Sequence, residues 1–257
     1  MNIKTTSSSL AAIGIFLSGL SILSPSVAAH AQSRFHSAAE KSSSRVSFVP
    51  RSDSPAPRRT HSGGSRNELP PACGGLPILP ESGIGLTTDD SPSLFVYFSQ
   101  ETTVEQAMLT LKTADDQEKE FYDTTVLLPQ AALQNRGGVV EFKIPEVDAG
   151  LTIGQNYEWS LVLMCNGELR PDSPTLSGFI KKVEAKNIDV DEASSLDRAI
   201  AYGGAGIWYD LLSTISSMRA EGSNVTDSSQ YWADVMSSVN LGVIADAPIV
   251  AKVDGME

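Results

Sequence analysis

Apolar side chains recur at every second position in several short runs between residues 94 and 184, which is the pattern of half-buried β-strands. The clearest runs are 94–98, 107–111, 139–144 and 157–165, and less regular ones cover 119–128 and 177–184. Gly, Pro, Asn and Asp residues separate the runs, as turns require. This succession of alternating runs and turn residues predicts an antiparallel β-sandwich of immunoglobulin-like shape over residues 68–188.

The spacing of apolar residues changes to a helical period after residue 189. Ile207, Leu211, Ile215 and Met218 recur at intervals of four, four and three, which places them on one stripe of a helix. Glycines 203, 204 and 206 predict two helices that meet near Ala205 and approach closely, and a third helix is expected over 228–239. Residues 189–257 therefore form a small helix-turn-helix, repeat-like part. It is too short for a solenoid of its own and is expected to pack on the sandwich. The predicted fold class is α+β, mainly β.

The first 31 residues have the features of a secretory signal peptide. An apolar stretch over residues 10–23 is followed by Pro25 and by the small-x-small pattern Ala29-His30-Ala31. An uncleaved membrane anchor is the alternative, but this stretch is shorter than the roughly 20 residues that span a bilayer. No later stretch is a candidate span, so we expect no transmembrane segment after signal removal. Export to the periplasm or the cell surface is the predicted localisation.

Residues 32–67 are rich in serine and in basic residues and are expected to be a disordered linker. Val46, Phe48 and Val49 form its only apolar cluster. The linker carries positive charge, whereas residues 68–257 hold 29 acidic and 11 basic residues. Such an acidic domain is not expected to bind nucleic acid, because phosphate backbones attract basic surfaces.

Cys73 and Cys165 are the two cysteines of the chain. In an exported protein an even pair predicts a disulfide, and with two cysteines only one connectivity is possible. Closing a loop of about 90 residues would stabilise the fold by roughly 2–4 kcal/mol on the loop-entropy model. Two buried free thiols are the alternative.

The sequence lacks the residues on which most common catalytic mechanisms depend. The three histidines all precede residue 68, which excludes a Ser-His-Asp triad, a Cys-His pair and a histidine-bound zinc from the folded part. Residues 187–198 resemble a calcium loop, but Glu192 replaces its glycine and Arg198 its bidentate glutamate. We predict no metal, no cofactor and no enzymatic activity. A carboxylate pair remains the one alternative route to hydrolysis.

Trp208, Tyr209 and Asp210 are the candidate binding residues. Trp and Tyr are enriched at interface hot spots, so these residues could form an exposed recognition patch. The alternative is that Trp208 is a wedge that fixes the helices against the sandwich, with Asp210 exposed or capping a neighbouring group.

Four segments together resemble a known family. They are PAC at 71–73, GLTTDDSPSLFVYFSQ at 85–100, GQNYEWSLVLMCN at 154–166 and GIWYDLL at 206–212. Their order and spacing resemble the cyanobacterial exported family called domain of unknown function 928, over most of residues 70–245. The resemblance implies a Gram-negative envelope context and the same two-part layout, but no activity.

The leading functional hypothesis is a non-enzymatic envelope module that binds an unknown protein or glycan partner, through the sandwich loops or the helical pair. The alternatives are a carboxylate-dependent hydrolase and a purely structural component of the wall or matrix.

Overall fold

The computed structural model describes most of the chain from residue 45 onward. The described residues are 45–51, 68–114, 120–145, 150–185, 188, 193–221 and 225–254. The predicted signal peptide, most of the predicted linker and residues 189–192 lie outside them.

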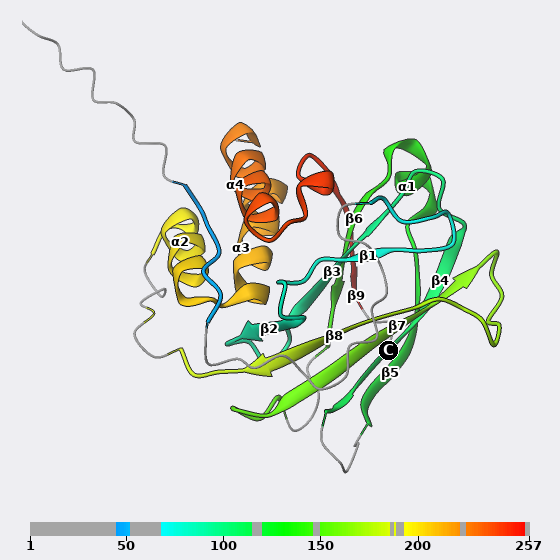
Figure 1. Cartoon of the computed structure of the whole chain (residues 1–257), viewed down its shortest axis with the longest axis horizontal. Coiled ribbons are helices and arrows are strands. Elements are labelled where there is room, and N and C mark those ends of the chain that lie inside the picture. Colours follow the sequence, from blue (N-terminus) through cyan, green and yellow to red (C-terminus); the bar gives the residue numbers. More distant parts are fainter. Residues whose placement is uncertain are drawn as a thin grey trace, which may run out of the picture. The chain divides into compact units, whose positions relative to one another are not determined.

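Nine strands within these residues form two sheets (Figure 1). The first has the order β1-β3-β6-β9, with β1 at Leu76–Pro77, β3 at Ser93–Phe98, β6 at Gly138–Lys143 and β9 at Ile249–Asp254. The second has the order β2-β8-β7-β4-β5, with β2 at Ile84–Thr87, β8 at Thr175–Lys182, β7 at Asn156–Cys165, β4 at Val104–Thr113 and β5 at Glu120–Leu127. The helices are α1 at Gln130–Arg136, α2 at Ser195–Ala205, α3 at Trp208–Ala220 and α4 at Val225–Ser238, with a 3₁₀ turn at Gly242–Ile244.

The mixed, mainly β class that the sequence predicts is confirmed, but the sheets are not wholly antiparallel. Strand β2 pairs with β8 in parallel, and β9 pairs with β6 in parallel. Parallel neighbours need long crossover connections, and the chain between β6 and β9 includes the three helices α2, α3 and α4. The region predicted as purely helical therefore ends in a strand, and neither the immunoglobulin-like topology nor a helical repeat is confirmed.

The two sheets differ in how they are buried. In β4 alternate residues such as Leu109 and Leu111 are buried while their neighbours are partly exposed, as expected for a sheet with one wet face. Strand β6 is buried on both faces. Its Glu141 side chain accepts a hydrogen bond from Ser216 of α3 at 2.6 Å, and Phe95 on the paired strand β3 contacts Trp232 of α4. Helices α3 and α4 therefore cover the first sheet.

The predicted stripe of α3 is buried, as expected, but so is most of the rest of its surface. Ile207, just before the helix, packs with Ile84 and Phe179, whereas the Tyr209 ring lies against Gly85. Ile84 and Gly85 are consecutive residues of β2, and consecutive residues of a strand face opposite sides of the sheet. Residues at the start of α3 therefore pack against both faces of the edge strand β2. A Cβ at Gly85 would lie 2.3 Å from the Tyr209 ring, so this strand needs a glycine there.

Residues 45–51, which we call the strap, pack against the helices, although the sequence predicts them to be part of a disordered linker. Val46 and Phe48 are buried, while Ser47 and Val49 between and after them are exposed. The Phe48 ring meets Trp208 edge to face, with centroids 4.7 Å apart. Two of the three apolar residues noted in the sequence, Val46 and Phe48, thus anchor this segment against the helices.

Gly203 and Gly206, where α2 meets α3, allow close approach of the strap rather than of a second helix. The Val49 amide donates a hydrogen bond to the Gly203 carbonyl at 3.0 Å. A Cβ at Gly203 would lie 2.3 Å from the Ser47 carbonyl oxygen, and one at Gly206 would lie 2.8 Å from that of Val49. Gly206 also has a φ of 71°, which favours glycine. In Figure 1 the strap is the blue segment that runs between α2 and α3.

This arrangement predicts opposite effects for two adjacent alanine substitutions. Alanine favours a helix over glycine by up to about 1 kcal/mol. Gly204→Ala should therefore raise the melting temperature, because nothing lies within 4 Å of its Cβ position. Gly203→Ala should lower it, because the new methyl group meets the strap backbone. Thermal unfolding followed by circular dichroism measures both, and an equal rise in the two variants would contradict the docked strap.

Candidate functional site

Asp210 in the first turn of α3 is a buried carboxylate whose two oxygens both accept hydrogen bonds. Thr87 at the end of β2 donates its hydroxyl to one oxygen at 2.7 Å. Thr88 donates its backbone amide at 3.2 Å and its hydroxyl as well. Of the two predicted alternatives, exposure and capping, the structure shows capping. The bonds join α3 to the loop that follows β2.

The loop over residues 87–92 is tied to both sheets. Asp89 pairs with Lys143 of β6 at 3.3 Å, and Asp90 pairs with Lys182 of β8. The Lys182 ammonium lowers the pKa of Asp90, mainly through their hydrogen bond. Because β6 and β8 belong to different sheets, the loop joins the two sheets and α3 at one place.

A pocket of about 160 Å³ opens between this loop and helices α2 and α3, and we call it the Asp210 pocket. Its lining residues are mostly polar: Thr87, Asp89, Pro92, Arg198, Tyr202, Tyr209, Asp210, Ser213 and Thr214. Within the described chain, the buried Nε–H of Arg198 has no hydrogen-bond partner, while its Nη2 reaches the Ala193 carbonyl at 3.5 Å. The pocket thus combines a guanidinium donor, carboxylates and hydroxyl groups.

Burial changes the acid–base behaviour of two lining groups. It raises the pKa of Asp210, although the hydrogen bonds from Thr88 and Thr87 act in the opposite direction. Burial also raises the pKa of the Tyr202 phenol, and the nearby Asp210 charge adds to that rise. Both groups line the pocket, so a ligand group there meets a carboxylate and a phenol whose charged forms are poorly solvated.

Trp208 and Tyr209 do not lie on the surface. Trp208 is 0% exposed and donates its Nε1–H to the Ile78 carbonyl at 3.1 Å. The Tyr209 hydroxyl accepts from Trp159 Nε1 and donates to the Phe179 carbonyl, both at 3.1 Å. Burial also raises the pKa of the Tyr209 phenol. These contacts match the wedge interpretation of Trp208, while Tyr209 and Asp210 border the pocket.

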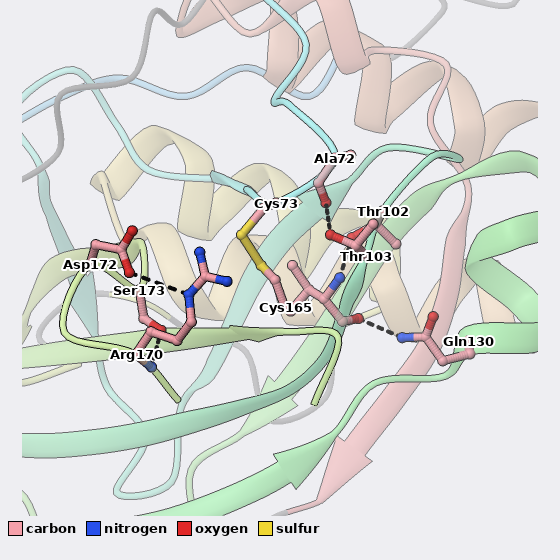
Figure 2. The surroundings of a disulfide bond; sticks show 10 residues. Ala72, Cys73, Thr102, Thr103, Gln130, Cys165, Arg170, Asp172 and Ser173 are labelled. Atoms are coloured by element: carbon pink, nitrogen blue, oxygen red, sulfur yellow. Dashed lines mark hydrogen bonds and ion pairs between the residues drawn. A yellow bond between two sulfur atoms is a disulfide. The ribbon is translucent and has the colours of Figure 1, made fainter. Parts of the chain in front are cut away.

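The predicted disulfide is present and joins Cys73 to Cys165 at the end of β7 (Figure 2). Hydrogen bonds hold the chain on both sides of it. The Thr103 amide donates to the Ala72 carbonyl at 2.8 Å, and the Gln130 side chain donates to the Val104 carbonyl. The bridge therefore fixes the segment before β1 to the strands of the second sheet.

Thr87, Arg198 and Tyr202 line the pocket and Thr88 bonds Asp210, but none of the four was singled out as a site residue from the sequence. Thr87 and Thr88 lie in the segment at 85–100 that carries the family resemblance, and Asp210 lies in the segment at 206–212. That two such segments meet at one carboxylate is the signal that could have pointed to them. Arg198 and Tyr202, four residues apart on α2, had no comparable signal.

Replacing Asp210 with asparagine should change how stability depends on pH. Burial raises the folded pKa of Asp210, so the folded state holds this proton more tightly than the unfolded state does. Its contribution to stability is present below the ordinary aspartate pKa and is lost as the pH rises through the folded pKa. Thermal unfolding across the acid range should therefore show the wild type losing stability relative to Asp210→Asn as the pH rises. Parallel curves would contradict the raised pKa, and the exposed Asp172→Asn serves as the control.

Two further findings concern the part of the chain that the structure describes. Among the described helices none is long and apolar enough to cross a membrane. Nowhere in the described ranges do three or more His, Cys, Asp or Glu side chains gather as metal ligands would.

Comparison with known proteins places the chain in a family. Neither the curated proteins nor the solved structures contain a significant match to it. The family model described as Domain of Unknown Function (DUF928) matches residues 61–249, which include strands β1 to β8, the disulfide and the Asp210 pocket and end at the first residue of β9. The chain therefore belongs to the DUF928 family.

Proposed function

We propose that this chain is an exported, non-enzymatic binding module of the cell envelope, and that the Asp210 pocket holds a hydroxyl-bearing group of a glycan partner. The signal-like residues 1–31 support export, and so does the disulfide, because such bonds persist in oxidising compartments. The family resemblance implies the same envelope context. The pocket lies between a sandwich loop and the helical pair, the two places where the sequence led us to expect binding.

The single observation that carries the proposal is the mixture of donors and acceptors in the pocket. Arg198 offers an N–H without a partner in the described chain, and the Asp89 carboxylate offers acceptor oxygens close by. A sugar hydroxyl both donates and accepts a hydrogen bond, so it can satisfy both groups at once. A purely anionic ligand would meet repulsion from Asp89 and Asp210.

A hydrolase is the second candidate, because Asp89 and Asp210 line the same pocket and paired carboxylates carry glycoside hydrolysis. The contacts favour binding instead. Both oxygens of Asp210 accept hydrogen bonds from threonine donors, and Asp89 is paired with Lys143. A general acid needs a raised pKa, which Asp210 has, but a carboxyl group whose two oxygens both accept hydrogen bonds from threonine is poorly placed to give its proton to a substrate.

The proposal is tested by measuring binding of the full chain to fractionated envelope glycans. Arg198→Gln removes the charged donor and should weaken binding by about 10-fold or more, as for loss of a hydrogen bond to a charged group. The control is Arg170→Gln on the exposed β7–β8 turn, which should bind like the wild type. Equal binding by both variants, or retention of no glycan by the wild type, would contradict the proposal. Glycan cleavage that Asp89→Asn abolishes would support the hydrolase.

A further inference from the structure

The strap occupies its groove as a bound peptide would. Its residues alternate between buried and exposed, with Val46 and Phe48 pointing into the core cluster. The Val49 amide of the strap donates a hydrogen bond to the Gly203 carbonyl. Side-chain anchors at alternate positions together with main-chain hydrogen bonds are the general features of extended-peptide recognition.

The groove is shaped for a backbone rather than for side chains. Gly203 faces the Ser47 carbonyl and Gly206 faces the Val49 carbonyl, at distances that exclude any Cβ. Trp208 lines the groove and contacts Phe48. Residues 52–67 separate the strap from the rest of the domain in the sequence.

We propose that this groove is an interaction site between copies of the chain, in which the strap of a second copy takes the place of the chain's own strap. The contacts of Val46, Phe48 and Val49 are the same in both arrangements, because the two straps have identical sequences. Exchange of an identical element between protomers is a low-cost route to dimers. When each copy donates its strap to the other, the dimer is closed.

Concentration decides between the two arrangements. Because only residues 52–67 separate the strap from the domain in the sequence, the chain's own strap has an effective concentration of about the millimolar range. A dilute protein is therefore monomeric, with its groove filled by its own strap. Copies that are gathered on a surface, or whose own strap is impaired, exchange straps.

Two complementary full-length variants test the proposal. Phe48→Ala removes the anchor of the strap and leaves the groove intact, whereas Gly203→Ala obstructs the groove and leaves the strap intact. Each alone should remain monomeric at micromolar concentration in sedimentation experiments. Mixed, they should form a one-to-one dimer, because the intact strap of one fits the intact groove of the other. Replacing Gly203→Ala with the control Gly204→Ala should reduce dimer formation at least 10-fold, since that variant fills its own groove.

A second measurement uses a labelled peptide with the sequence of residues 45–51. It should bind the Phe48→Ala chain at least 10-fold more tightly than the wild type, whose groove is occupied. The same peptide with alanine in place of Phe48 should bind at least about 30-fold more weakly, as for an aromatic hot spot. A mixture that stays monomeric, equal peptide binding by wild type and variant, or a Phe48→Ala chain that fails to fold would each overturn the proposal. The last result would show that the strap cannot be separated from the core.

Discussion

Replacing Trp208 with alanine is expected to lower the free energy of unfolding by about 3–5 kcal/mol, the range for removing a buried tryptophan. The ring is 0% exposed, contacts Phe48 of the strap and donates a hydrogen bond to the Ile78 carbonyl. The substitution leaves a cavity and removes the hydrogen bond to the Ile78 carbonyl at the same time. Denaturant unfolding measures the loss, and the exposed Leu169→Ala serves as the control for removing an apolar side chain.

The same experiment tests whether the helices and sheets are one cooperative unit. Trp208 and Tyr209 lie in one apolar cluster with Leu109 and Phe142 from the two sheets. Wild type and Trp208→Ala should therefore each unfold in a single calorimetric transition. Two resolved transitions in the wild type, or a variant as stable as the wild type, would contradict this picture.

Removing the disulfide is expected to cost about 2–5 kcal/mol. Cys73 and Cys165 are 92 residues apart in the sequence, so the bond restricts a large part of the unfolded chain. The double variant Cys73→Ser, Cys165→Ser should unfold at a lower denaturant concentration than the wild type. The wild type with a reducing agent should lose a similar amount of stability. A double variant with unchanged stability would show that the bond does not restrict the unfolded chain.

Patterns that are local in the sequence predicted their elements well. The four-residue intervals from Ile207 placed α3, and the glycines at 203–206 placed the junction between α2 and α3. The third helix begins at Val225 rather than at the predicted 228. Each of these features depends on residues that are only a few positions apart, because both the period of a helix and its capping signals are local in the sequence.

Apart from the disulfide, the features that join distant segments could not be predicted from the sequence. The two threonines that bond Asp210 lie more than 120 residues before it, and no periodicity connects them. The strap was missed because Val46 and Phe48 are too few to outweigh a serine-rich surrounding. Strand β9 was missed because its parallel pairing with β6 depends on where three helices return the chain. Tertiary packing decides each of these.

The Asp210 pocket as a binding site is the central claim, and hydrogen exchange of the full chain with and without the retained glycan fraction tests it most directly. Bound glycan should slow amide exchange in the loop at 87–92 and around Arg198 and Ser213, which face the pocket. Exchange in β4 and β5, on the far side of the second sheet from β2, should stay unchanged. Slowed exchange confined to β4 and β5, or no change at the pocket, would contradict the claim.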